Sequence, residues 1–243
     1  MRLDRFLSMA GYGSRTDVRD LVRTGRVRVT GEVVRDPGLR LSDGDPPAVE
    51  VDGSPAEYRR WIHLMLHKPA GVVTAMDDPR HPTVAGLVPP RYLLRGVTPV
   101  GRLDIDVTGL LVLTSDGVLA HRLASPKWGV DKTYRIEYEG PEFTDGDAAG
   151  FAAGLALADG TVCLPARLEP VREGLAMLTI HEGRFHQVKN MVLAAGRRLT
   201  ALSRIRTGPL SLDPALPPGE CRELTAEEAG ALYASVRLDS ARE

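Results

Sequence analysis

Apolar residues near the start of the chain recur at steps of three and four positions. Leu3, Phe6, Leu7 and Ala10 fall on one face of a helix, and glycines follow at positions 11 and 13. This spacing is typical of an amphipathic helix, and glycine readily ends one because it accepts left-handed backbone conformations. The pattern therefore predicts a short first helix over residues 3–10.

A second helix is predicted directly after these glycines. Ser14 suits the N-cap, and Asp17 stands where a capping box needs an acidic side chain, although Glu is the more usual residue there. Gly25 is a natural C-terminal stop. The apolar face of this helix is formed by Val18, Leu21 and Val22.

The chain then changes from helical to strand-like alternation. Residues 26–29 alternate polar and apolar, Thr30 and Gly31 predict a turn, and residues 32–34 predict a second strand. Residues 42–60 are rich in Pro, Gly and charge. We interpret that stretch as the end of a small module followed by a linker.

Strands dominate the remainder of the pattern. Strands are predicted at 64–66, 72–74, 110–113, 132–138 and 175–180, with a loop at 77–82 and a closing turn at 115–117. Helices are predicted at 147–157 and 186–195, and a last helix begins at the capping box of Thr225 and Glu228. Because strands outnumber helices and no regular βαβ alternation occurs, the fold class is α+β with a largely antiparallel sheet.

Composition narrows the class of protein further. Hydrophobic residues make up 43% and charged residues 26% of the 243 positions, as in soluble globular proteins. No apolar run approaches the roughly 18 residues of a membrane span, and the N-terminus lacks a secretory apolar core. Cys163 and Cys221 have no metal-binding spacing. We expect a cytoplasmic protein without a structural disulfide.

Charge is distributed unevenly along the chain. The net charge is -1, yet residues 1–41 hold nine Arg against five acidic residues. Arg15, Arg19 and Arg23 recur at four-residue steps and therefore line one helix face. Such a row is often only a solvated face, but a local basic patch matters more for nucleic-acid binding than the net charge does.

Two segments of the second half resemble the signatures of a known enzyme family. The first is Gly101-Arg102-Leu103-Asp104-Ile105-Asp106, continued by Thr108-Gly109-Leu110-Leu111, and the second is Glu182-Gly183-Arg184-Phe185-His186-Gln187-Val188-Lys189. Together, in this order, they resemble the RsuA-like branch of the pseudouridine synthases. The two helices and small strands at the start resemble the S4 RNA-binding module. The resemblance implies an S4 domain with linker at 1–58 and a catalytic domain at 62–238.

The resemblance also implies roles for individual residues. Asp104 matches the catalytic carboxylate, Lys189 the basic residue that pairs with it, and Tyr134 the aromatic that stacks on the target base. Because burial disfavours an ionised carboxylate, Asp104 needs a cation beside it. RNA contacts are expected from Arg102, Arg184 and Gln187, and from the S4 residues Arg15, Arg19 and Arg23.

The expected reaction converts a uridine of ribosomal RNA into pseudouridine, so the chain is expected to be an isomerase. The uridine must leave its base stack, and a carboxylate assists cleavage of its glycosidic bond, by a logic related to that of glycosidases. No redox change occurs, so neither a cofactor nor a metal is expected. We expect a monomer, unattached to membranes, acting on 16S RNA or an immature small subunit. The compact start at Met1 and the segments 77–83 and 104–106 favour that subgroup.

Three departures from the family pattern are noted. Val107 stands where Ser or Thr is usual, and Thr108 is the nearest hydroxyl; Phe185 replaces a common Tyr, and Asn190 a usual Arg. We expect these changes to affect RNA contacts more than chemistry.

Other functions compete with this one. They are the same reaction on 23S RNA, a non-catalytic S4 assembly factor, and an Asp-dependent hydrolase with Asp106 as its second carboxylate. His63 and His67 lack a third partner for a metal site.

Overall fold

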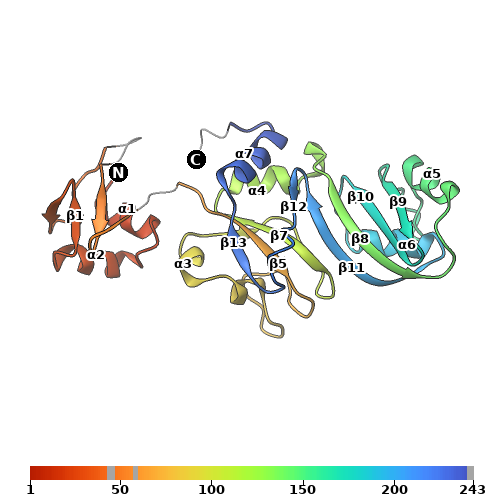
Figure 1. Cartoon of the computed structure of the whole chain (residues 1–243), viewed down its shortest axis with the longest axis horizontal. Helices are drawn as coiled ribbons and strands as arrows, with labels where there is room; N and C mark the ends of the chain where they lie inside the picture. The colour runs from red at the N-terminus through yellow and green to blue at the C-terminus, as the bar shows by residue number, and fades with distance from the viewer. Residues whose placement is uncertain (43–46, 57–59, 240–243) are drawn as a thin grey trace. The chain divides into compact units, whose positions relative to one another are not determined.

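The computed structural model describes residues 1–42, 47–56 and 60–239. Contacts within the chain divide it into two compact units (Figure 1). Among the described residues, the smaller unit comprises Met1–Ile62 and Val88–Val97, and the larger comprises His63–Leu87 and residues 98–239. The domain limits expected from the sequence, 1–58 and 62–238, stay a prediction.

The smaller unit packs two helices against a four-stranded antiparallel sheet of order β2-β1-β3-β4. Its elements are α1 (Leu3–Met9), α2 (Arg15–Arg23), β1 (Val27–Val29), β2 (Glu32–Val34), β3 (Val49–Val51) and β4 (Ser54–Pro55), and α3 (Pro90–Leu93) falls in the same unit. The predicted capping box of α2 is present, with Ser14 and Asp17 bonded reciprocally. Thr30 and Gly31 both adopt positive φ, as a two-residue hairpin loop between β1 and β2 requires.

Residues 42–60, interpreted as the end of the small module followed by a linker, hold the last two strands of that module's sheet. β3 and β4 lie there, and Val49 and Val51 are buried in the same core as Leu3, Phe6 and Val22. Residues 43–46 and 57–59 of that stretch are outside the described residues.

The larger unit is built on a nine-stranded sheet whose main path is β13-β5-β7-β11-β8-β10-β9. Its strands are β5 (His63–Lys68), β6 (Thr98–Pro99), β7 (Thr108–Thr114), β8 (Lys132–Glu139), β9 (Arg167–Arg172), β10 (Leu175–Ile180), β11 (Arg198–Thr207), β12 (Leu210–Ser211) and β13 (Cys221–Glu223). β11 pairs with β7 in parallel, and the other strand pairs that the structure describes are antiparallel. The α+β, largely antiparallel fold class is therefore confirmed.

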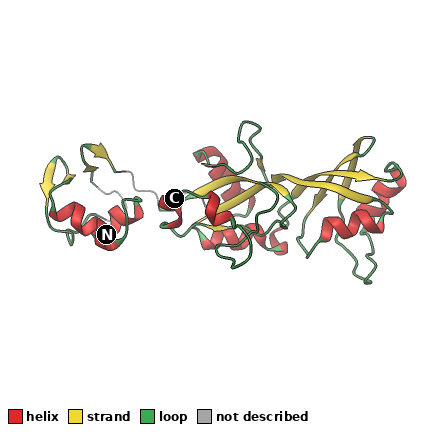
Figure 2. Ribbon diagram, turned by 90° about the horizontal axis from the view of Figure 1, so that it is seen from below, coloured by secondary structure: helices red, strands yellow, loops and turns green. Residues whose placement is uncertain are grey.

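Helices gather at two places along this sheet (Figures 1 and 2). They are α4 (Gly117–Ala124), α5 (Asp145–Ala153), α6 (Gln187–Ala194) and α7 (Ala226–Ser235), with 3-10 turns at Val84–Leu87 and Pro126–Trp128. Leu119, Leu123, Leu232 and Tyr233 pack α4 and α7 into one core with Leu110 of β7. None of the described helices is long and apolar enough to cross a membrane.

Two local predictions in the larger unit were wrong or incomplete. Residues 72–74 form no strand, because only Val73 makes an isolated bridge while the Thr74 hydroxyl bonds the backbone of Leu103. The predicted turn at 115–117 is the start of α4, whose N-cap Asp116 accepts from the backbone N–H groups of Val118 and Leu119.

Candidate active site

The Asp104 loop, residues 101–107, leads from β6 into β7. Its backbone is hydrogen-bonded by side chains of β5 and of the segment that follows β5. The buried Lys68 ammonium donates to the carbonyl oxygens of Pro69 at 3.0 Å and Val107 at 2.9 Å. Thr74 donates to the Leu103 carbonyl at 2.7 Å and accepts from the Leu103 N–H at 3.1 Å. The loop backbone is thus fixed at both ends around Asp104.

Lys68 is fully buried, which is unusual for a lysine. Burial lowers its pKa to about 8, against the opposing pull of the carboxylates of Asp106 and Asp104. The ammonium therefore remains largely charged at neutral pH. It supplies positive charge below the loop as well as hydrogen bonds to it.

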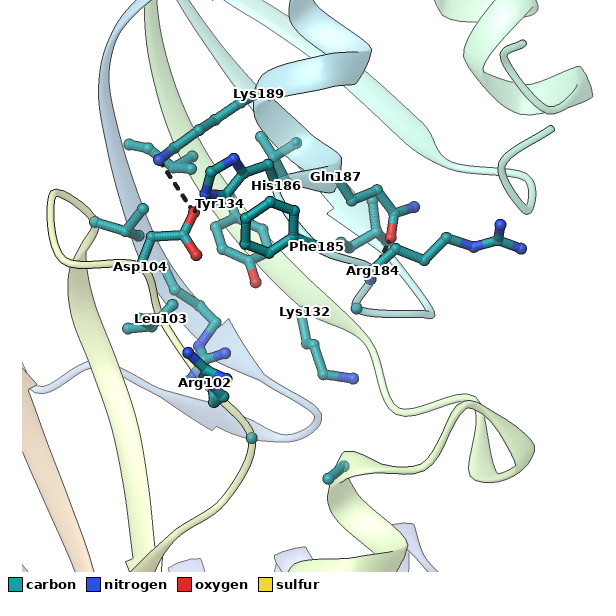
Figure 3. Close-up of a pocket in the computed structure, with 18 residues that line it drawn as sticks. Arg102, Leu103, Asp104, Lys132, Tyr134, Arg184, Phe185, His186, Gln187 and Lys189 are labelled. Atoms are coloured by element: carbon teal, nitrogen blue, oxygen red, sulfur yellow. Dashed lines mark hydrogen bonds and ion pairs between the residues drawn. The ribbon is translucent and has the colours of Figure 1, made fainter. Parts of the chain in front are cut away.

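A second cation reaches the loop from α6. The Lys189 Nζ lies 3.1 Å from Asp104 Oδ2 (Figure 3). It also lies 2.7 Å from Asp106 Oδ1. Burial acts to lower the Lys189 pKa, but its bonds to Asp106 and Asp104 outweigh burial and leave that pKa raised. His186 Nε2 is a further 3.6 Å neighbour of Asp104 Oδ2. The predicted pair of Asp104 and Lys189 is therefore brought together.

These groups open into a cavity of about 360 Å³ that lies over the middle of the sheet. β8 places Tyr134 there, 7% exposed, and the neighbouring strand β11 places Arg204 opposite it in the pairing register. The cavity is lined by Gly101, Arg102, Leu103, Asp104, Val107, Ala124, Lys132, Tyr134, Ile180, Gly183, Arg184, Phe185, His186, Gln187, Val188, Lys189, Leu202 and Arg204.

Two buried cations belong to the sheet side of this cavity. Arg204 is 3% exposed and its Nε donates to the Leu110 carbonyl at 2.8 Å. Lys132 is 8% exposed and donates to the Val130 carbonyl at 3.0 Å. Burial, reinforced by the charge of Arg204, lowers the Lys132 pKa to about 8. A pocket with several cations, aromatic side chains and a partly exposed carboxylate suits an anionic ligand with a flat ring.

The second motif segment is organised around a buried acid. Glu182 accepts from the Gln187 amide at 2.8 Å, the Arg184 Nε at 2.9 Å and the Leu164 N–H at 2.9 Å. Burial acts to raise the Glu182 pKa, but these bonds outweigh it and the pKa is lowered. This carboxylate therefore stays ionised and fixes the turn that precedes α6.

The Gln187 side chain takes part in this arrangement. It is 3% exposed, and its oxygen accepts from the Arg184 N–H at 3.0 Å, so it shapes the turn that lines the cavity. Arg184 stays half-exposed and points away from Asp104 in Figure 3. Arg102 is exposed on the opposite side of the pocket, in the Asp104 loop.

The three arginines predicted from the S4 resemblance belong to the smaller unit. Arg15, Arg19 and Arg23 are all exposed along α2. Arg19 lies 3.6 Å from the buried carboxylate of Asp4, whereas the structure gives Arg15 and Arg23 no acidic partner among the described residues.

The departure at Val107 has a local explanation. Its side chain is buried, and its backbone joins the loop network by donating to the Asp104 carbonyl and accepting from Lys68. The nearby Thr108 hydroxyl bonds the Leu202 carbonyl at 3.5 Å instead. Asn190 is exposed.

Sequence reasoning missed the supporting groups Lys68, Thr74, Lys132 and Arg204. Lys68 precedes the Pro-Ala-Gly turn, and Lys132 starts the alternating strand of Tyr134, so both stood next to recognised features. Nothing in the local pattern distinguished Arg204 or Thr74. Their roles depend on which strands become neighbours.

The histidines considered for metal binding are used structurally. His63 Nδ1 lies 2.8 Å from the Thr114 hydroxyl, and His67 Nδ1 lies 2.8 Å from the Leu216 carbonyl. Among the described residues, no group of three or more His, Cys, Asp or Glu side chains is arranged to hold a metal ion.

Known proteins are similar to this chain in both fold and sequence. Residues 62–194 match the RNA pseudouridylate synthase family and residues 1–46 match the S4 domain. A solved structure described as a pseudouridylate synthase superposes with a TM-score of 0.66 at 33% identity, covering 96% of this chain and 99% of that one. The chain belongs to the RNA pseudouridylate synthase family and carries an S4 domain.

Full-length relatives place it in the RsuA-like branch. The ribosomal small subunit pseudouridine synthase A of Pseudomonas aeruginosa is 44% identical, over 94% of this chain and 98% of that protein. Its Escherichia coli counterpart is 41% identical, with 94% and 98% covered. An RNA pseudouridine synthase of Bacillus subtilis, YtzG, is 42% identical, with 94% and 96% covered. The resemblance inferred from the two motif segments is therefore confirmed.

Proposed function

We propose that this enzyme isomerises one uridine of 16S ribosomal RNA, with Asp104 as its nucleophile. The observation that carries the proposal is the position of Asp104, 3.1 Å from the Lys189 ammonium in a cavity that the Tyr134 ring also lines. The choice of 16S RNA is supported by relatives named for the small subunit, among them the Pseudomonas aeruginosa protein.

The reaction rearranges bonds within one nucleotide. The N1–C1′ bond breaks, uracil turns, a C5–C1′ bond forms, and the proton leaves C5 while N1 regains one. Atoms and electrons balance without a co-reactant. The target must be extruded from its stack, which costs a few kcal/mol and less in a loop.

Each site residue has a part in this scheme. Lys189 holds the Asp104 carboxylate from 3.1 Å, and Asp104 attacks either the sugar C1′ or the base. Tyr134 stacks on the extruded uracil, since an aromatic face holds a flat ring without fixing its rotation. Arg102 helps hold the extruded nucleotide, and Arg184 contacts phosphate. Arg15, Arg19 and Arg23 bind RNA from the smaller unit.

The competing hydrolase mechanism is less well supported. Such an enzyme needs a protonated second acid, and Asp106 is the nearby candidate. Asp106 is 64% exposed and bonded to Lys189. Burial acts to raise its pKa, but Lys189, a backbone hydrogen bond and His186 together outweigh burial and keep that pKa lowered. Asp106 is therefore unsuited to donate a proton.

The test uses purified protein with unmodified 16S and 23S transcripts and immature subunit particles. Pseudouridines are mapped by carbodiimide-blocked reverse transcription, with Asp104→Asn as the inactive variant and Glu173→Gln, an exposed acid on the same unit, as its control. We expect one new stop in 16S RNA, lost in Asp104→Asn and kept in Glu173→Gln.

The other outcomes are equally informative. A stop only in 23S RNA would contradict the 16S assignment and keep the chemistry. Free uracil would indicate hydrolysis. Tight RNA binding without any stop would favour a non-catalytic assembly factor, and turnover by Asp104→Asn would exclude Asp104 as nucleophile.

A further inference from the structure

Phe185 is exposed in a way that the other phenylalanines of the chain are not. Phe6, Phe143 and Phe151 are at most 6% exposed, whereas Phe185 is 81% exposed. Single apolar side chains on a surface need no special explanation. This ring, however, lines the same cavity as the carboxylate of Asp104.

The ring is also held in place. It stacks on the imidazole of His186, with the centroids 3.7 Å apart and the planes 21° from parallel. Figure 3 shows the two rings next to each other. His186 caps α6 with a φ of +51°, a left-handed conformation that is costly for a residue other than glycine.

His186 links this stack to the chemistry. Its Nε2 lies 3.6 Å from Asp104 Oδ2, and its carbonyl accepts from the Asn190 N–H at 2.9 Å in the first turn of α6. One face of the Phe185 ring is therefore covered by His186, and the high exposure of the side chain leaves its remaining surface to a ligand.

The cavity thus has two aromatic rings at different depths. Tyr134 is nearly buried, so it suits a base that has entered the cavity, whereas the exposed Phe185 suits a base that stays at the rim. Extruding one nucleotide leaves the bases on either side of it without a stacking partner. We infer that Phe185, backed by His186, stacks on a nucleobase that adjoins the extruded uridine and so helps to select the RNA sequence or loop around it.

This inference rests on the proposed function, and its test measures binding separately from turnover. Two proteins are compared, Asp104→Asn and the double variant Asp104→Asn with Phe185→Ala. Each is titrated with the rRNA segment that contains the mapped pseudouridine. If the wild-type enzyme forms no pseudouridine, the segment is identified by footprinting instead. The same segment is prepared with each flanking nucleotide made abasic in turn. Leu193→Ala is the matched control, because Leu193 is 68% exposed on α6 but does not line the cavity.

Loss of one base–aromatic stack is expected to weaken RNA binding by between about fivefold and 150-fold. Phe185→Ala should show this loss on intact RNA and no loss on the RNA whose stacked base is missing. Phe185→Tyr should bind nearly as well as the parent, and Phe185→Leu should fall between them. Leu193→Ala should bind unchanged.

Two results would overturn the inference. One is equal affinity of the parent and Phe185→Ala for intact RNA. The other is that Phe185→Ala loses the same affinity for intact RNA and for both abasic RNAs. That result would indicate a structural effect, and Phe185→Tyr would then lose affinity as well. Failure of the wild-type enzyme to form pseudouridine would instead count against the proposed function, while leaving the binding comparison decisive for stacking.

Discussion

Two sets of three cations, one in each unit, carry their positive charge in opposite ways. In the smaller unit, the Arg15, Arg19 and Arg23 side chains stand on an exposed helix face. In the larger unit, Lys68, Lys132 and Arg204 are at most 8% exposed, and each donates to backbone carbonyls. The same residue types therefore serve two purposes.

The difference follows from the cost of burying charge. An exposed guanidinium keeps its hydration and acts on phosphates through screened, salt-dependent attraction. A buried ammonium must be compensated by hydrogen bonds or carboxylates, so it fixes the groups that compensate it. The smaller unit is accordingly suited to attract RNA, and the larger one to hold a carboxylate loop in place. Four predictions test this contrast.

The largest effect is expected from Lys189→Met, which removes the ammonium from Asp104 and Asp106. Turnover should fall by about 10² to 10³-fold, as for removal of one preorganised electrostatic interaction, while RNA affinity changes little. Single-turnover kinetics measures both. Lys189→Arg should recover part of the rate, and Asp106→Asn should cost only a few-fold, because Asp106 is 64% exposed. A Lys189→Met rate within threefold of wild type would contradict the pairing role.

Lys68→Met should affect stability and activity together. It leaves the Pro69 and Val107 carbonyls without their buried donor, and each unsatisfied group costs about 1–3 kcal/mol. The free energy of unfolding in urea should fall by about 3 kcal/mol, and turnover should fall because the Asp104 loop loosens. The exposed Lys127 provides the control Lys127→Met. An unchanged unfolding free energy would show that Lys68 does not support the loop.

His63 gives the larger unit a pH dependence. Burial lowers its pKa to about 4, although Asp116 opposes this. His63 takes up its proton near pH 6.5 in the unfolded chain but only near pH 4 in the folded one. Its contribution to the free energy of unfolding is therefore fully present above pH 6.5. It falls as the pH drops toward 4, by up to roughly 3 kcal/mol. Urea unfolding at pH 7 and 4.5 should show less pH dependence in His63→Gln than in wild type or in the exposed-site variant His121→Gln. Equal pH dependence in all three would refute the assignment.

The smallest effect is expected in the smaller unit. Replacing Arg15, Arg19 and Arg23 by Ala should weaken RNA binding and reduce the slope of log affinity against log salt concentration, by about 0.7 for each phosphate no longer neutralised. Arg19→Ala alone should change the slope less than Arg15→Ala alone, because Arg19 already lies beside Asp4. Fluorescence anisotropy at several salt concentrations measures the slopes. If the triple variant kept the wild-type slope, the row would be only a solvated face.

Elements with strong local signals were predicted well. The capping boxes of α2 and α7, the strand β10 and the helix α6 all occur within a residue or two of their predicted positions. The prediction of a helix at 147–157 was displaced, because α5 begins at its N-cap Thr144 and ends before Gly154. Elements that depend on their neighbours were missed, above all β11.

β11 shows why some of the fold could not be read locally. Its ten residues include three arginines, and this composition by itself would indicate a polar, exposed segment. It nevertheless lies between β7 and β8, and its irregular register against β8 allows Arg204 to be buried and bonded to Leu110. Pairing with two neighbouring strands, not propensity, makes it a strand.

The candidate site divides in the same way. The amino-acid sequence by itself determined the family, through two motif segments in order, and with it the candidates Asp104, Tyr134 and Lys189. It also determined the capped helices, because a capping box is completed within four residues. Tertiary structure alone decided that Lys68 and Thr74 hold the Asp104 loop, that Gln187 turns inward to Glu182, and that Phe185 remains exposed on His186. Those arrangements join segments far apart in the chain, or depend on how much water each side chain meets, and both are properties of packing that no local pattern contains.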